Sequence, residues 1–131
     1  MHSYNYRRNG PDNPPEPDQL NPEINLGTGT LDRGKWSSII DRFISDVNNY
    51  DFMGRNLDIR ENIKFKGGYF PKWLHQKYPE NVCCLSIEFR KFFMDEWTGE
   101  GYKEIIKAIE EMLKFTVSYN LNKINNFGKD K

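Results

Sequence analysis

The sequence is short of cysteine, net charge and long apolar runs, and each shortage excludes a class of protein. Its only cysteines, Cys83 and Cys84, are adjacent in an apolar run, which suits buried thiols in a reducing compartment better than a disulfide framework, with a vicinal redox pair as the alternative. The 19 basic and 19 acidic residues cancel, so no global field directs the chain to nucleic acid. No segment has the roughly 20 apolar residues of a membrane span or the layout of a signal peptide. We therefore expect a cytoplasmic protein that binds neither nucleic acid nor membrane.

Aromatic residues, by contrast, are plentiful. They make up 15% of the 131 residues and include three tryptophans, nine phenylalanines and seven tyrosines. Such large side chains need a core to bury them, which excludes disorder throughout the chain. A chain of this length fits one domain that buries roughly two-thirds of its unfolded surface. We expect a single domain over residues 1–131.

The first 34 residues differ in composition from the rest. They hold five of the seven prolines and four glycines, without helical or strand periodicity. We expect a long loop over 1–34, an α/β portion over 35–120 and a flexible tail over 121–131. The GTGT run at 27–30 lacks the Gly-Lys-Ser/Thr ending of a phosphate-binding loop, so we interpret it as a turn.

Apolar spacing predicts three helices in the α/β portion. Between Lys35 and Asn49, apolar residues recur at the i, i+3, i+4 and i+7 spacing of an amphipathic helix. A second such pattern starts at Tyr102 and continues for about 18 residues, within the usual helix length. Residues 69–78 predict a short helix that Pro79 ends.

Two segments predict strands. Residues 81–90 (NVCCLSIEFR) form a nearly continuous apolar run, typical of a strand covered on both faces. Residues 57–66 alternate less cleanly and indicate a weaker strand or an extended segment. Helices interleaved with strands predict a layered α/β fold. A buried central strand needs two neighbours, and the sequence offers at most one or two others, so we expect an incomplete sheet with few strands.

Glu88 interrupts the apolar run near its carboxyl end. An unpaired buried carboxylate is costly, so Glu88 needs either a partner or a function. One hypothesis pairs it with Arg90 on the same strand face. The other makes it a general base at the carboxyl edge of a strand, where open α/β sheets place their ligand sites. Arg7 and Arg8 are likewise either solvated or suited to bind a substrate carboxylate in a fork-like geometry.

The two histidines do not by themselves define a metal site. His2 is near a chain end, where histidines are usually solvated, and His75 lies in the predicted helix 69–78. Two histidines and two adjacent cysteines without Cys-x-x-Cys or His-Glu-x-x-His spacing cannot assemble a closed four-ligand zinc site.

Four separated blocks nevertheless resemble one enzyme family. They are HSYNYRRNGPD (2–12), NPEINLGTGTLDR (21–33), NIKFKGGYFPKW (62–73) and IEFRKFFMDEWTGE (87–100). In this order they resemble the later half of the N-formylglutamate amidohydrolases, a branch of the zinc carboxypeptidase-like superfamily. The resemblance covers the chain to about Gly101. It implies an incomplete three-layer αβα fold of the zinc carboxypeptidase-like type.

The resemblance also implies roles for individual residues. His2 corresponds to a zinc ligand, and Glu88 to the base that activates the zinc-bound water for hydrolysis of an amide bond. The implied substrate is a small acidic N-acyl amino acid. The residues implied to line the pocket or to face the substrate carboxylates all lie in one block: Tyr4, Asn5, Arg7 and Arg8.

The family takes its other two zinc ligands, a His and a Glu, from an upstream segment that this sequence does not contain. We therefore expect the chain to be the later part of an amidohydrolase, unable to bind zinc stably and inactive alone. An exposed sheet edge left by truncation would favour self-association.

Two competing hypotheses come from other classes. In the first, the chain is a non-catalytic α/β accessory domain with Glu88 in a structural ion pair with Arg90. Its signature would be a complete, well-covered sheet, with His2 disordered and more than about 10 Å from Glu88, beyond the reach of a shared site. In the second, Arg7, Arg8 and the aromatic residues bind nucleic acid, which the neutral net charge disfavours.

Overall fold

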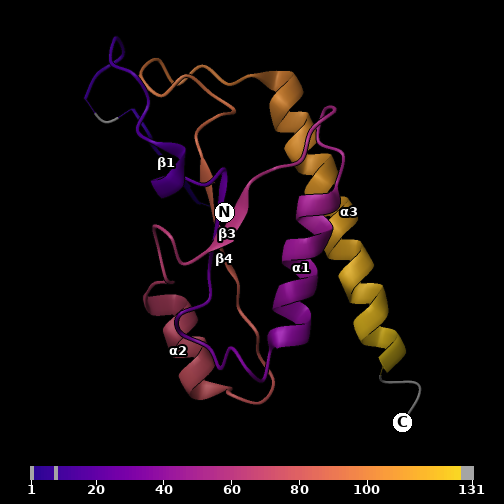
Figure 1. Cartoon of the computed structure of the whole chain (residues 1–131). Helices are drawn as coiled ribbons and strands as arrows, with labels where there is room; N and C mark the ends of the chain where they lie inside the picture. Colours follow the sequence, from indigo (N-terminus) through magenta and orange to yellow (C-terminus); the bar gives the residue numbers. More distant parts are fainter. Residues whose placement is uncertain (1, 8, 128–131) are drawn as a thin grey trace.

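The computed structural model describes residues 2–7 and 9–127, with side chains through residue 118 (Figure 1). In this part, the elements in chain order are β1 (His2–Tyr4), a 3-10 helix (Asp18–Leu20), β2 (Ile24–Gly27), α1 (Ser37–Asn49), β3 (Ile59–Glu61), α2 (Tyr69–Lys77), β4 (Ser86–Arg90) and α3 (Lys103–Phe127). The predicted α/β class is confirmed. None of these helices is long and apolar enough to span a membrane.

The four described strands form one mixed sheet in the order β1-β4-β2-β3. β4 pairs in parallel with β1 and antiparallel with β2, and β2 pairs in parallel with β3. The predicted buried strand β4 therefore has a neighbour on each side. The sequence offered at most one or two strands besides it, and the described residues hold three. Both neighbours come from residues 1–34, where a long loop was expected.

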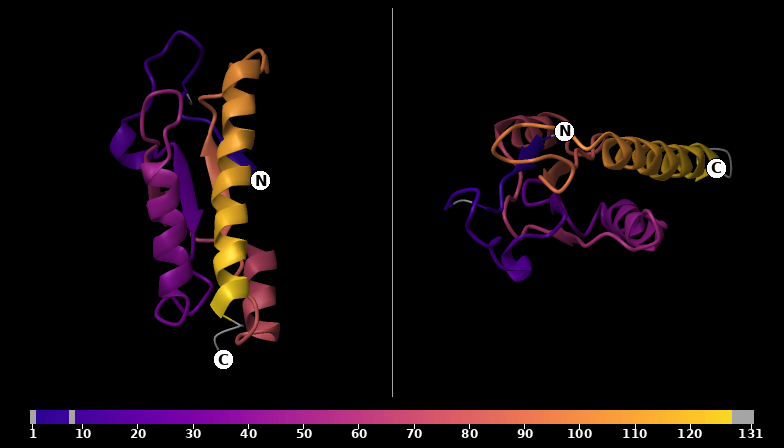
Figure 2. Two further views of the ribbon diagram at one scale, coloured as in Figure 1. Left: turned by 90° about the vertical axis from the view of Figure 1, so that its right-hand side faces the viewer. Right: turned by 90° about the horizontal axis from the view of Figure 1, so that it is seen from above.

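The face of the sheet toward α1 and α3 forms the core. Leu26 and Phe89 are fully buried there, together with Ile40 of α1 and Met112 of α3. Alternate residues of a strand point to opposite faces, so the apolar residues of β2 and β4 all reach this side. α1 and α3 lie on this side of the strands, whereas α2 lies on the other (Figures 1 and 2).

The predicted helices are present, with one difference in length. α1 buries Ile40, Phe43 and Val47, as its apolar spacing predicts, and α2 ends before Pro79. α3 continues to Phe127, so the first seven residues of the expected tail are helical. The predicted strands are shorter than expected, because only Ile59–Glu61 and Ser86–Arg90 pair with neighbours.

Candidate functional site

The register of β1 and β4 brings His2 opposite Glu88. Nδ1 of His2 lies 4.0 Å from Oε1 of Glu88, with the His2 side chain 81% exposed and that of Glu88 19% exposed. The two residues are 86 positions apart in sequence, and the parallel pairing of short strands alone brings them together. The structure thus joins the two residues for which the sequence predicted a shared site.

A hollow of about 470 Å³ opens beside this pair, and we call it the Glu88 hollow. Its floor is the start of β4 and the residues before it, and its walls come from the segment around Gly67 and the start of α2. The residues that line it are His2, Phe65, Gly67, Gly68, Phe70, Pro71, Cys84, Leu85, Ser86, Ile87 and Glu88. Small-molecule sites in proteins have volumes in this range.

Asn25 of β2 fixes one wall of the hollow. It is fully buried and pairs with Glu88 in the sheet register, on the face opposite the core. Its Oδ1 accepts hydrogen bonds from the N–H groups of Ile63 and Lys64, at 3.1 and 2.8 Å, and its Nδ2 donates to the carbonyl of Phe65 at 2.9 Å. The N–H of Phe65 also donates to Oδ1, at 3.4 Å, so one side chain satisfies four backbone groups and holds this segment on the sheet.

Glycines in the GTGT run let the same segment approach the sheet closely. A Cβ on Gly27 would lie 2.8 Å from the backbone nitrogen of Gly67, and one on Gly29 would lie 3.0 Å from the carbonyl oxygen of Lys66. The N–H of Gly29 donates to that carbonyl at 2.8 Å. The run therefore begins with the last residue of β2, Gly27, and continues into a turn at Gly29 and Thr30, where the sequence predicts one. It also forms a packing surface.

Arg90 does not pair with Glu88 in the described structure. Its Nη1 donates to Oδ1 of Asp18 at 2.9 Å and to the carbonyl of Asn21 at 2.8 Å, and its Nη2 lies 3.9 Å from Oε1 of Glu23. The accessory-domain hypothesis expected a Glu88–Arg90 ion pair and a His2 remote from Glu88, and the described residues show neither feature. It also expected a well-covered sheet, and β4 does have a strand on each side, so the accessory-domain role stays a prediction.

Tyr4 and Asn5, implied to line a pocket, occupy different environments. The Tyr4 side chain is buried, and its hydroxyl donates to the carbonyl of Pro22. Burial raises the pKa of Tyr4 to about 12, with Arg90 acting in the opposite direction. Oδ1 of Asn5 is buried without a hydrogen-bond partner among the described residues. The substrate-binding roles of both residues stay predictions.

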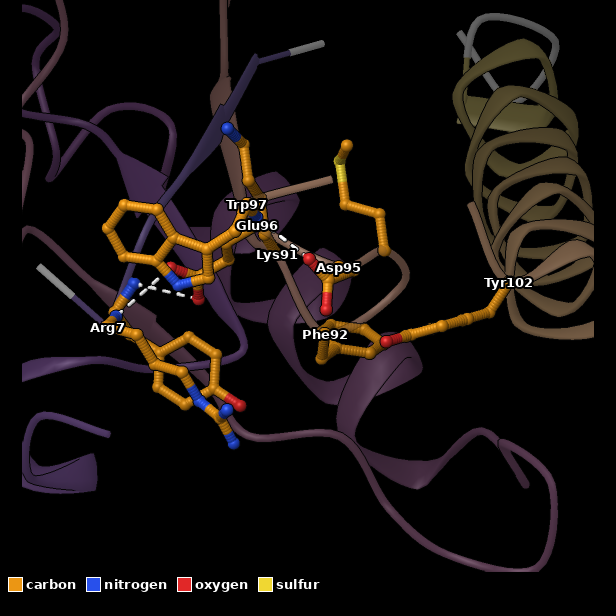
Figure 3. A pocket seen from close by; sticks show the side chains of 9 residues that line it. Arg7, Lys91, Phe92, Asp95, Glu96, Trp97 and Tyr102 are labelled. Atoms are coloured by element: carbon orange, nitrogen blue, oxygen red, sulfur yellow. Dashed lines mark hydrogen bonds between the residues drawn. The ribbon is translucent and has the colours of Figure 1, made fainter. Parts of the chain in front are cut away.

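Arg7 lines a separate, smaller pocket of about 130 Å³, which we call the Arg7 pocket (Figure 3). Lys91, Trp97 and Tyr102 line it as well. It lies beyond the last residues of β1 and β4, whereas the Glu88 hollow lies beside the start of β4. The structure therefore does not place Arg7 in one hollow with His2 and Glu88. Arg8 lies outside the described residues.

Glu96 organises the Arg7 pocket, and sequence reasoning did not single it out. Its two carboxylate oxygens accept hydrogen bonds from the backbone N–H groups of Tyr6 and Arg7, at 3.2 and 3.1 Å. The neighbouring Asp95 accepts from the N–H groups of Trp97 and Thr98, which lowers the pKa of its carboxyl. The only sequence signal was two adjacent acids in the DEWTGE block.

His75 and the cysteines have structural environments, as the sequence predicts. The Nε2 of His75 accepts a hydrogen bond from the N–H of Cys84 at 2.9 Å, so the ring proton of the neutral imidazole is on Nδ1, 2.9 Å from Oγ1 of Thr30. Cys83 and Cys84 are free and partly buried, and burial raises the pKa of both thiols. Raised pKa values keep thiols protonated and unreactive near neutral pH.

The residues described do not complete a zinc site. His2 and Glu88 are close enough to approach one ion, since two ligands of a tetrahedral zinc lie roughly 3.3 Å apart. However, no group of three His, Cys, Asp or Glu side chains in the described part of the chain is placed to hold a metal. A three-ligand zinc platform therefore does not fit these residues.

Comparison with known proteins adds no family assignment. No family model, curated protein or solved structure matches the chain. The chemistry of the site is therefore interpreted from its own geometry.

Proposed function

We propose that this chain carries the proton-transfer half of an amide-hydrolase site of the N-formylglutamate amidohydrolase type. The observation that supports it is the His2–Glu88 pair, 4.0 Å apart across parallel strands at the mouth of an open hollow. In this proposal the fold is of the zinc carboxypeptidase-like, three-layer αβα type. The two helices on one side of the sheet and the one on the other are compatible with it (Figure 1).

Glu88 is the general base of the proposed reaction. Its carboxylate is mostly buried but faces the hollow, where a water molecule and an amide carbonyl carbon can meet it. It accepts a proton from the attacking water as the carbon–oxygen bond forms, and then delivers that proton to the leaving nitrogen as the carbon–nitrogen bond breaks. A positioned carboxylate of this kind contributes roughly 10²- to 10⁴-fold to a reaction rate.

The proposed substrate is a small acidic N-acyl amino acid, and Arg7 is the proposed partner of a substrate carboxylate. Its guanidinium can bind a carboxylate in the bidentate geometry that lysine cannot offer. Since the site has the single imidazole of His2, and the described residues form no three-ligand platform, we expect no turnover from the 131 residues alone.

A binding experiment tests the shared site without requiring turnover. In ¹H NMR spectra of the full chain, we expect added Zn²⁺ to shift the imidazole signals of His2. The imidazole signals of His75 should stay unchanged, because both of its ring nitrogens are hydrogen-bonded. Glu88→Gln should weaken the His2 response, and Glu110→Gln, an exposed carboxylate on α3, should not. A His2 response that is identical in Glu88→Gln would contradict the proposal.

A turnover assay with N-formyl-L-glutamate and Zn²⁺ complements the NMR experiment. The rate of glutamate release is measured for the wild-type chain and for Glu88→Gln. We expect this rate to be no higher than in a protein-free blank. Release that is faster than the blank and unchanged in Glu88→Gln would contradict the role of Glu88.

A further inference from the structure

The Glu88 hollow is lined mainly by apolar groups, and its described lining residues include no arginine or lysine. Phe65 and Phe70 line it with side chains that are 38% and 63% exposed, and Pro71 lies beside them. The ionisable side chains among its described lining residues are His2, Glu88 and the protonated thiol Cys84. An acidic ligand group placed here would face a carboxylate without an arginine or lysine to offset the repulsion.

The hollow is also much larger than a formyl group needs. Its volume of about 470 Å³ corresponds to a site for a ring or a branched chain rather than for a single carbon. Phe70 stacks on Trp73, with ring centroids 6.2 Å apart and planes 17° apart. The adjoining segment with Phe65 and Gly67 is held against the sheet by Asn25 and by the close approach at Gly27. A preorganised apolar wall favours a flat apolar occupant.

We propose that the Glu88 hollow binds an uncharged aromatic acyl group, so that the amide substrate is an aroyl rather than a formyl derivative. This inference rests on the proposed function for the reaction, whereas binding of the aroyl group depends only on the hollow. Cations for the acidic end of such a substrate lie in the Arg7 pocket, which Arg7 and Lys91 line. The two carboxylates in that pocket, Asp95 and Glu96, already accept hydrogen bonds from backbone N–H groups. The acyl group and the acid group are thus recognised by different parts of the chain.

Two uncharged probes that differ only in their acyl group test the inference. N-benzoylglycinamide and N-formylglycinamide are titrated into the ¹⁵N-labelled full chain, and amide signals are followed by NMR. We expect the benzoyl probe to shift the amide signals of Gly67, Gly68 and Ser86, which line the hollow. The amide signal of Gly99, which does not line it, should stay unchanged. Burial of a phenyl ring should make it bind about tenfold more tightly than the formyl probe, or better.

Neighbouring aromatic residues on α2 provide matched variants. Phe70 lines the hollow, whereas Tyr69 is 84% exposed and does not. Phe70→Ala should weaken benzoyl binding about two- to tenfold, the usual value of one aromatic contact, and Tyr69→Ala should leave it unchanged. Because both side chains are exposed, neither variant is expected to unfold the chain.

The inference would be overturned by equal affinity for the two probes, by shifts spread over signals outside the hollow, or by equal losses in the two variants. Its failure is distinguishable from failure of the proposed function. If the benzoyl probe binds but the Zn²⁺ response of His2 is the same in wild type and Glu88→Gln, the aroyl subsite is supported and the hydrolase proposal is contradicted. If Glu88→Gln weakens the Zn²⁺ response but the benzoyl probe binds no better than the formyl probe, the hydrolase site is supported and the aroyl subsite is contradicted.

Discussion

The two faces of the sheet are built from the same strands but are held by different interactions. On one face, Leu26 and Phe89 are fully buried beneath α1 and α3. On the other, Asn25, Glu88 and His2 form one row across three strands. The first face is stabilised by apolar burial, and the second by the hydrogen bonds of Asn25 to a neighbouring segment. This division leaves Glu88 accessible at a hollow without exposing the core.

The largest effect is expected on the apolar face. Phe89→Ala should lower the free energy of unfolding by about 3–5 kcal/mol, because it leaves a cavity under two helices. Urea denaturation followed by circular dichroism measures it. Phe70→Ala, which removes a ring of the same size from an exposed position, is the control and should cost far less. Similar losses in the two variants would mean that the apolar face is not the core.

Asn25→Ala should rank second, although it changes the polar face. It leaves the N–H groups of Ile63 and Lys64 without their acceptor, and each unsatisfied buried group costs about 1–3 kcal/mol. Amide hydrogen exchange should also accelerate selectively in residues 63–65. Asn49→Ala, at an exposed position of α1, is the matched control. Unchanged exchange in this segment would refute the role assigned to Asn25.

Tyr4→Phe should have a smaller effect that depends on pH. At neutral pH the variant loses one hydrogen bond to the Pro22 carbonyl, worth about 1 kcal/mol. Burial raises the pKa of Tyr4 to about 12 from its usual value of 10. The unfolded chain therefore releases this proton first, and wild-type stability should fall as the pH rises from 10 to 12. Urea titrations at pH 8 and 11 should show the difference between wild type and Tyr4→Phe shrinking or reversing, and a constant difference would contradict it.

Glu88→Gln should change stability least. Because its partner His2 is 81% exposed, the pair is screened by solvent and contributes little, about 0–1 kcal/mol, although the Glu88 side chain is mostly buried. The same urea experiment measures it, with Phe89→Ala as the reference for a large loss. A loss of unfolding free energy in Glu88→Gln as large as that in Asn25→Ala would show that Glu88 stabilises the fold. It would contradict the account in which Asn25 is the structural residue of the polar face and Glu88 the functional one.

Periodicity predicted the long elements because their apolar spacing extends over several turns. α1 and α2 match the prediction, and α3 runs past it because residues 103–127 contain no glycine or proline. β1 and β2 were missed because they have three and four residues, too few for a pattern, and Asn25 and Gly27 interrupt the apolar residues of β2. β3 ends early where Asn62 adopts a left-handed conformation, with φ at 53°.

The site was predictable only in part. Glu88 could be identified from its own segment, because a carboxylate inside an apolar run is costly. His2 drew attention only through the resemblance of its block to a family. Asn25 and Glu96 were missed because their partners are backbone N–H groups of distant segments, and no local pattern says which backbone groups will face a side chain.

The most direct test of the central claim is whether the His2 imidazole senses Glu88 in solution. The chain has only two histidines, so their ring signals can be assigned in ¹H–¹³C NMR spectra at pH 8, without added metal. The 4.0 Å separation predicts that Glu88→Gln shifts the His2 ring signals and leaves those of His75 in place. His2 signals that coincide in the two proteins would show that the pair does not form, and would contradict the account.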